Sequence, residues 1–166
     1  AELISKTVPN GPLEIIWDKS KPSGDKIRLM DIKRAKNLIK SAKESGACAV
    51  KFQTFTPDSL TIDSDSEEFT LKEGTWKGRN LYDLYKETHT PWEWFPELFS
   101  YAKELGITLF SSPFDKAAVD FLEQLDAPAY KIASNELTDW PLVEAAVKTG
   151  KPIIVSTGSA NLDLIQ

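Results

Sequence analysis

The second half of the sequence alternates two kinds of segment at a regular interval. Three stretches have the length and apolar content of buried strands: "ITLFSSPF", "PAYKIAS" and "KPIIVSTG". The segments between them, "DKAAVDFLEQLDA" and "DWPLVEAAVKTG", have the spacing of amphipathic helices. Phe110 precedes Lys131 by 21 residues and Lys131 precedes Ile154 by 23, which is typical of consecutive βα units. Such alternation produces a parallel sheet with right-handed crossovers, so the sequence predicts an α/β fold.

A similar pattern begins earlier in the chain. "IKRAKNLIKSAKESGA" repeats apolar residues at three- and four-residue spacing, with Gly46 placed to end the helix, and "CAVKFQTF" follows as a strand. Residues from about 56 to 80 form an acidic, turn-rich excursion that shows neither the periodicity of a helix nor that of a strand. Its "DSDSEE" run lacks the spacing and glycine of a calcium loop, so we interpret it as a solvated loop.

Two more helices are expected before the regular repeat begins. "LYDLYKETH" forms the first, and the second starts in "TPWEWFPELFSYAKELG", where Thr90 can cap it, Pro91 suits its first turn and Gly106 ends it. The aromatic residues of this second helix are interpreted as core. The histidine between the two helices, His89, is assigned a loop-packing or solvent-facing role.

Composition narrows the class of protein. The chain has 166 residues, enough for one domain, and its net charge of -5 argues against a general nucleic-acid surface. One cysteine, Cys48, excludes an internal disulfide framework and is interpreted as a small buried residue. No apolar run approaches the ~20 residues of a membrane span, and no signal peptide is recognised. We therefore expect a cytoplasmic protein without a membrane partner.

Polar side chains gather where four predicted strands end. The strand ends carry Lys51 and Gln53, Ser111 and Ser112, Lys131 and Ser134, and Ser156 and Thr157. Ligands of parallel α/β folds bind outside the carboxyl ends of the strands, so these groups are expected to converge. Two ammonium groups with several hydroxyls suit a phosphorylated or carboxylated small molecule, and the turn at Gly158 could add backbone amides.

Each of these residues also has a structural interpretation. A serine or threonine at a strand end often caps a helix or stabilises a turn. A lysine within a strand can extend its amine from an edge of the sheet to water. The two lysines, in phase with hydroxyls on successive strands, nevertheless favour a shared anion site.

The same segments resemble the N-acetylneuraminate (sialic acid) synthase family. "AVKFQTFTPDSLT", "TPWEWFPELFSYAKELGITLFSSPFD" and "AVDFLEQLDAPAYKIASNELTDWPLVEAAVKTGKPIIVSTG" carry the resemblance, which runs from about residue 32 to 166. "EGTWKGRNLYDLYKETHTPWEW" resembles the pseudaminic acid synthase branch. The resemblance implies a partial TIM barrel, incomplete at its C-terminal side, and condensation of phosphoenolpyruvate with an N-acetylated amino sugar into a nonulosonic acid. It also implies a divalent metal, Mn²⁺ or Mg²⁺.

The resemblance implies roles for particular residues. Lys51 and Lys131 match lysines that hold phosphoenolpyruvate, and Gln53 matches a glutamine that contacts substrate. The hydroxyls around the phosphate and carboxylate are matched by Ser112, Ser134 and Ser156. Glu136 matches a catalytic acidic residue near the reacting centre. These roles agree with the chemistry, since a trianionic substrate must have its charge neutralised before a carbonyl can approach.

Residues 1–31 depart from the family pattern. The family has "AE" and then an "NHNG"-type loop directly before the helix at residue 32, and this chain has no such loop. Glu2 either corresponds to the family's catalytic glutamate or matches it by accident. "EIIWDKSKPSGDKIRLMDIKRA" resembles the C-terminal end of GDP-fucose synthase-like nucleotide-sugar reductases/epimerases. We interpret 1–31 as an irregular segment of foreign origin and 32–166 as the partial synthase domain.

The predicted barrel is also short at its other end, since a TIM barrel takes about 250 residues. The family's metal-binding histidines belong to later strands, so we assign no metal ligand, and His89 does not replace them. Besides a synthase, two interpretations stay open: a non-catalytic phosphate-ligand-binding or assembly fragment, and an aldolase that forms a Schiff base through Lys131. An open sheet exposes an edge, so we expect a homo-oligomer or a partner that completes it.

Overall fold

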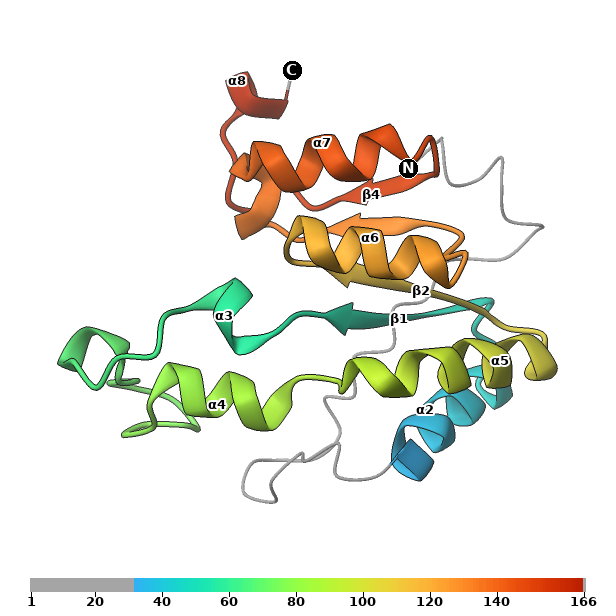
Figure 1. Cartoon of the computed structure of the whole chain (residues 1–166), viewed down its shortest axis with the longest axis horizontal. Coiled ribbons are helices and arrows are strands. Elements are labelled where there is room, and N and C mark those ends of the chain that lie inside the picture. Colours follow the sequence, from blue (N-terminus) through green and yellow to red (C-terminus); the bar gives the residue numbers. More distant parts are fainter. Residues whose placement is uncertain (1–31, 166) are drawn as a thin grey trace.

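The computed structural model describes residues 32–165 (Figure 1). The predicted N-terminal segment 1–31, with Glu2, lies outside the described residues. The strands are β1 (Ala49–Thr54), β2 (Thr108–Pro113), β3 (Tyr130–Ile132) and β4 (Ile153–Val155). The longer helices are α2 (Ile32–Glu44), α4 (Leu81–Thr88), α5 (Phe95–Leu105), α6 (Lys116–Gln124) and α7 (Trp140–Lys148). Short helices are α3 (Pro57–Leu60) and α8 (Leu162–Ile165), with 3₁₀ turns at Glu67–Phe69, Trp92–Trp94 and Asn135–Thr138.

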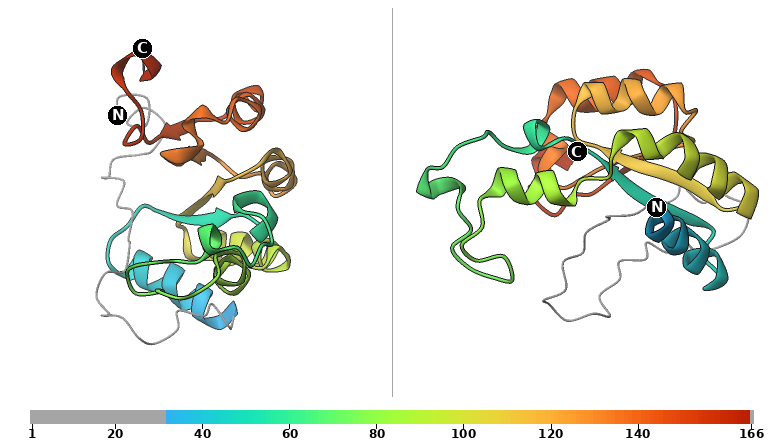
Figure 2. Two further views of the ribbon diagram at one scale, coloured as in Figure 1. Left: turned by 90° about the vertical axis from the view of Figure 1, so that its left-hand side faces the viewer. Right: turned by 60° about the horizontal axis from the view of Figure 1, so that its bottom comes forward.

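The four strands form one parallel sheet in the order in which they occur along the chain. Helices α2, α5, α6 and α7 pack against one face of this sheet, as the left view of Figure 2 shows. A doubly wound sheet would reverse its strand order and place helices on both faces. Sequential order with helices on one face is instead the arrangement of a barrel wall. The predicted α/β fold, with part of a TIM barrel, is confirmed.

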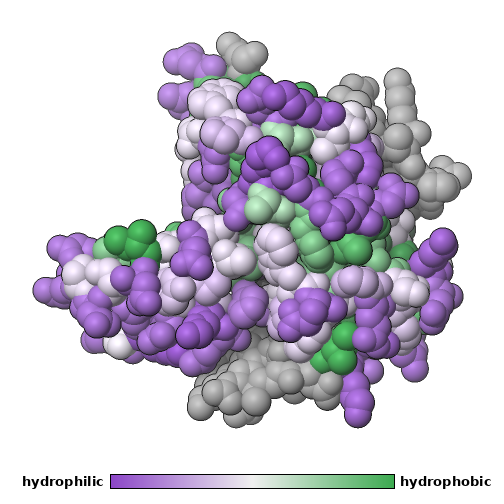
Figure 3. All heavy atoms as spheres, in the orientation of Figure 1, coloured by the Kyte–Doolittle hydropathy of each residue, from purple (hydrophilic) through white to green (hydrophobic). Residues whose placement is uncertain are grey.

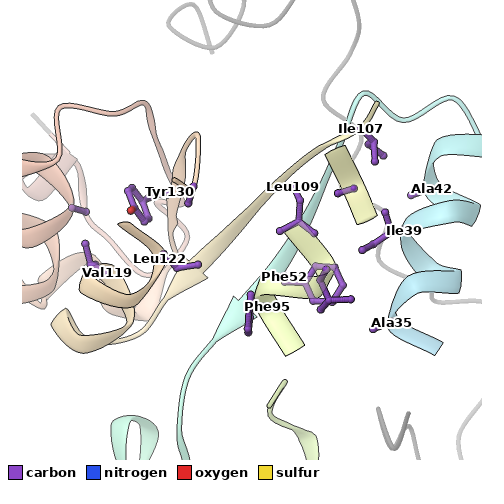
Figure 4. Packing of buried hydrophobic residues seen from close by; sticks show 14 of the residues in the cluster. Ala35, Ile39, Ala42, Phe52, Phe95, Ile107, Leu109, Val119, Leu122 and Tyr130 are labelled. Atoms are coloured by element: carbon purple, nitrogen blue, oxygen red, sulfur yellow. The ribbon is translucent and has the colours of Figure 1, made fainter. Parts of the chain in front are cut away.

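The hydrophobic core lies between the sheet and these helices (Figure 4). Alternate side chains of the strands point into it, including Phe52, Leu109 and Tyr130, and they meet apolar residues such as Ile39 and Leu122 on the helices. Each fully buried side chain of this size contributes about 1.5–3 kcal/mol of transfer free energy. Packing against the helices therefore stabilises the sheet from one side. The opposite face of the sheet is called here the inner face, and it is available for other roles.

The helix predicted to start at Thr90 starts later. Thr90 is buried and caps nothing, the 3₁₀ turn Trp92–Trp94 follows, and α5 begins at Phe95 with Pro96 in its first turn. The indole of Trp92 donates to the carbonyl of Phe55 at 3.2 Å, which holds this turn against the end of β1. Proline suits the first turn of a helix because it has no N–H to satisfy, and two prolines here compete for that place. The prediction that Thr90 caps the helix was wrong.

Glycine ends two helices as predicted. Gly46 follows α2 with a φ of 89°, and Gly106 follows α5 with a φ of 66°, conformations in which other residues are strained. Residue Cys48 begins the approach to β1 and is partly buried. The two glycines therefore lie in short connections that lead from α2 to β1 and from α5 to β2.

Residues 56–80 project from the sheet as an excursion that the sequence pattern predicted as irregular (Figure 1). The backbone N–H of Leu71 donates a hydrogen bond to the carbonyl of Arg79 at 2.9 Å, which closes the loop between them. The guanidinium of Arg79 donates two hydrogen bonds to the carboxylate of Glu87 in α4. The ring of His89 packs edge-on against Phe55, and its Nδ1 lies 3.0 Å from the carbonyl oxygen of Lys86. The loop-packing role of His89 is confirmed.

Hydrophilic side chains cover most of the surface over the helices and the excursion (Figure 3). Within residues 32–165, no helix combines the length and the apolar character that crossing a membrane requires.

Candidate functional site

The alternation of side chains along β1 separates its residues between the two faces of the sheet. Phe52 packs into the core under the helices, so Lys51 and Gln53 lie on the inner face. The parallel register places Lys51 beside Phe110 and Gln53 beside Ser112 on β2. Three of the predicted residues, Lys51, Gln53 and Ser112, are therefore brought together on the inner face.

The two serines of β2 point in opposite directions. Ser111 is buried on the helix side, where its hydroxyl lies 2.7 Å from that of Thr54. Ser112 is 1% exposed on the inner face, and its hydroxyl has no hydrogen-bond partner within residues 32–165. The expectation that both serines converge on one site is wrong for Ser111, because adjacent residues of a strand face opposite sides. An unpartnered buried hydroxyl is costly unless a ligand or water satisfies it, so Ser112 is a position where a ligand group would be stabilised.

Lys131 lies on the same face of β3. Its neighbours Tyr130 and Ile132 are buried in the core, and Tyr130 is paired with Ser111, so the next residues along, Lys131 and Ser112, are adjacent on the inner face. The predicted juxtaposition of Lys131 with Lys51 and Ser112 therefore follows from the register.

The two lysines make this part of the inner face electropositive. Burial and the neighbouring charge of Lys131 lower the pKa of Lys51 from 10.5 to about 8. Burial also lowers the pKa of Lys131, and the nearby carboxylate of Glu136 acts in the opposite direction. The amine of Lys51 makes a long 3.5 Å contact with the carbonyl oxygen of Phe52. An anion between the two amines would relieve their repulsion and replace the water that burial removes.

Phe110 is a site residue that the sequence interpretation missed. It is 3% exposed and lies beside Lys51 in the register, on the inner face rather than in the helix-side core. An apolar neighbour strengthens the electrostatic interactions of a charged group by excluding water. The sequence "TLFSSP" could have indicated this position, because Phe110 and Ser112 are two residues apart in a strand and therefore lie on the same face.

The loops after β3 and β4 are joined by hydrogen bonds. Ser134 Oγ accepts from the backbone N–H of Ser159 at 2.8 Å, and Ser159 Oγ donates to the side-chain oxygen of Asn135 at 2.8 Å. Glu136 lies in the 3₁₀ turn that follows Ser134. Ser156 is half-buried just after β4, and its N–H donates to the carbonyl of Ile132 at 3.1 Å. Ser134 and Glu136 thus lie just beyond the carboxyl end of β3, and Ser156 lies just beyond that of β4.

The turn at Gly158 differs from what its sequence indicated. We expected free backbone amides there for an anion, but the amide of Ser159 is used by Ser134. Helix α8 begins only at Leu162 and has four residues. The turn therefore supports the neighbouring loop.

The divalent metal implied by the resemblance has no evident place in this part of the chain. No three His, Cys, Asp or Glu side chains between residues 32 and 165 are grouped so that they could hold a metal ion. The described residues do not fit a metal site, so no chemical step is assigned to one here.

A parallel sheet in sequential order, with helices on one face and Lys51, Ser112 and Lys131 on the other, is part of the wall of a (β/α) barrel. The chain belongs to the NeuB family, whose pattern matches residues 38–166. This confirms the family resemblance of the sequence.

Similar proteins agree with this assignment. The chain is 50% identical to pseudaminic acid synthase of Campylobacter jejuni over 129 residues, which are 78% of this chain and 38% of that protein. It is 46% identical to pseudaminic acid synthase of Helicobacter pylori over 130 residues, again 78% of this chain and 38% of that protein. The solved structure of N-acetylneuraminic acid synthetase from Leptospira borgpetersenii, in complex with citrate, matches with a TM-score of 0.68 and 25% identity, over 81% of this chain and 42% of that chain. The chain thus spans about two-fifths of the length of these relatives.

Proposed function

We propose that this chain provides the phosphoenolpyruvate-binding wall of a synthase that condenses phosphoenolpyruvate with an N-acetylated amino sugar to form a nonulosonic acid of the pseudaminic type. The observation that carries the proposal is the pair Lys51 and Lys131 on the inner face, with the unpartnered hydroxyl of Ser112 between their strands. Membership of the NeuB family and the similarity to pseudaminic acid synthases support the identity of the anion and the sugar.

The proposed roles follow from the charges of the reactants. Phosphoenolpyruvate carries a phosphate and a carboxylate, and the lysine amines would neutralise them while the hydroxyls of Ser112, Ser134 and Ser156 donate hydrogen bonds. Gln53 is exposed beside Ser112 and would contact substrate from β1. Donors fixed in place before reaction also stabilise charge that develops as the enol carbon attacks the sugar carbonyl.

Glu136 is proposed as the acidic residue nearest the reaction. Its carboxylate acts electrostatically on Lys131, so it lies near the amine that would hold the anion. There it can accept a proton from an attacking water as phosphate is released from the adduct. The overall reaction consumes phosphoenolpyruvate, sugar and one water, and yields the nonulosonic acid and inorganic phosphate.

Binding and turnover are tested separately. The full chain is titrated with phosphoenolpyruvate by calorimetry, and it is then incubated with phosphoenolpyruvate, an N-acetylated amino sugar and Mn²⁺ while phosphate release is measured. Binding with release supports the synthase. Binding without release supports the alternative, a non-catalytic phosphate-ligand-binding fragment, and absence of binding contradicts both.

A Schiff-base aldolase is a second candidate because one observation favours it. The lowered pKa of Lys51 keeps part of its amine neutral near pH 8, and a neutral amine is what imine formation needs. Borohydride reduction in the presence of pyruvate, followed by mass spectrometry, distinguishes the two. A stable adduct on Lys51 or Lys131 supports the aldolase, and an unmodified chain supports the synthase.

A further inference from the structure

Ser134 receives a hydrogen bond from a loop that lies 25 residues further along the chain. The backbone N–H of Ser159 donates to its Oγ at 2.8 Å. A hydroxyl has one proton to donate and two lone pairs that accept, so this bond occupies one lone pair and leaves the proton available. The amide therefore favours the orientation in which Ser134 acts as a donor.

The residue before that amide leaves little room. A Cβ added at Gly158 would lie 3.1 Å from Ser134 Oγ, tighter than most contacts of this kind. Gly158 is not among the glycines with a positive φ, so its backbone conformation does not require glycine. What the position requires is space, and the group that needs the space is the hydroxyl of Ser134.

We propose that Gly158 and the backbone amide of Ser159 position Ser134, so that its hydroxyl donates to the anion bound on the inner face. The inference rests on the proposed function and adds to it one positioning residue, Gly158, and one backbone amide, with no role for the side chain of Ser159. Gly158 acts by lacking a side chain, which lets the loop after β4 approach Ser134, and Ser159 acts through its N–H. The loop after β4 thereby sets the position of a hydroxyl that lies in the loop after β3.

A double-mutant cycle tests this coupling. Phosphoenolpyruvate is titrated into the full chain, into Gly158→Ala, into Ser134→Ala and into the double variant. We expect Gly158→Ala to weaken binding about fivefold, because the added methyl group displaces the Ser134 hydroxyl, and Ser134→Ala to weaken it by a similar factor. The double variant should bind no more weakly than Ser134→Ala alone, because alanine removes the Oγ that the methyl group would displace.

The outcomes separate this inference from the proposed function. If the wild-type chain binds phosphoenolpyruvate and the two effects multiply in the double variant, Gly158 does not act through Ser134 and the inference is overturned. If the wild-type chain does not bind phosphoenolpyruvate, the proposed function and this inference both fail.

A matched control distinguishes the amide from the side chain of Ser159. Ser159→Ala keeps the N–H that reaches Ser134 and removes only the hydroxyl that donates to Asn135. We expect its affinity for phosphoenolpyruvate to stay within twofold of wild type. A loss as large as that of Gly158→Ala would mean that the tie to Asn135, rather than the amide, positions the loop. Urea unfolding of the same variants identifies a merely structural effect, which would lower stability equally with and without Ser134.

Discussion

Replacing Lys51 by methionine tests the buried charge on the inner face. Burial and the charge of Lys131 lower the pKa of Lys51 from 10.5 to about 8, so the protonated amine is disfavoured in the folded chain. Since one pKa unit corresponds to about 1.4 kcal/mol, this charge lowers the free energy of unfolding by about 3 kcal/mol at pH 7. Methionine has a similar length and no charge. We therefore expect Lys51→Met to raise the free energy of unfolding by about 3 kcal/mol at pH 7 while it removes phosphoenolpyruvate binding.

The pH dependence of this gain has a defined sign. Below pH 8 the lysine is protonated in both the folded and the unfolded chain, so the full cost is present. Between pH 8 and 10.5 the folded chain loses its proton first, which relieves the cost, and the advantage of Lys51→Met should fall to about 1 kcal/mol at pH 10.

Urea unfolding at pH 7 and pH 10, followed by tryptophan fluorescence, measures both values. Lys40→Met is the control, because Lys40 is exposed and its contact with Glu44 is 3.7 Å long, so its effect should stay below about 0.5 kcal/mol at both pH values. If Lys51→Met is no more stable than wild type at pH 7, or if its advantage is unchanged at pH 10, the buried charge of Lys51 does not destabilise the folded chain.

Three further predictions concern the fold. Leu122→Ala should lower the free energy of unfolding by about 3 kcal/mol in urea, because Leu122 is fully buried against the sheet; a loss below about 1 kcal/mol would contradict the core assignment. Glu123 accepts from Tyr130 and pairs with Lys151 at 2.8 Å; burial raises its pKa, but these hydrogen bonds outweigh it and the net pKa is lowered. Glu123→Gln should therefore cost about 1 kcal/mol at pH 7, and this cost should shrink as the pH falls and the carboxylate of the folded chain takes up a proton; a cost that does not change with pH would contradict this. Strand β4 is an edge of the described sheet and leaves Val155 46% exposed, so size-exclusion chromatography should show self-association, and a monomer at all concentrations would contradict the predicted homo-oligomer.

The order of helices and strands could be predicted because it depends on local periodicity. Segments such as α6 and β2 carry clean patterns, and the glycines that end α2 and α5 have a backbone conformation that favours glycine. The start of α5 could not be predicted, because Thr90 and Pro91 satisfy the local rules for a cap while the contact of Trp92 with Phe55 decides the turn. A local pattern does not contain that tertiary contact.

The candidate site was predicted in part for the same reason. Lys51, Ser112 and Lys131 share a face of the sheet. Side chains alternate between the two faces along each strand, so this arrangement could be predicted from the sequence alone. The rejection of Ser111 follows from the same alternation and could have been made from "FSSP" alone. The lowered pKa of Lys51 and the contact between Gly158 and Ser134 depend on which strands and loops are neighbours, so they required the structure.

Titration of phosphoenolpyruvate into wild type and Lys131→Ala at pH 7 is the most direct test that the inner face binds this anion. Lys131→Ala removes one of the two ammonium groups of the half-buried site, so we expect at least tenfold weaker binding. Lys103→Ala, at an exposed position of α5, should leave the affinity unchanged. Equal affinity of the wild type and Lys131→Ala would contradict the proposal that the inner face binds phosphoenolpyruvate.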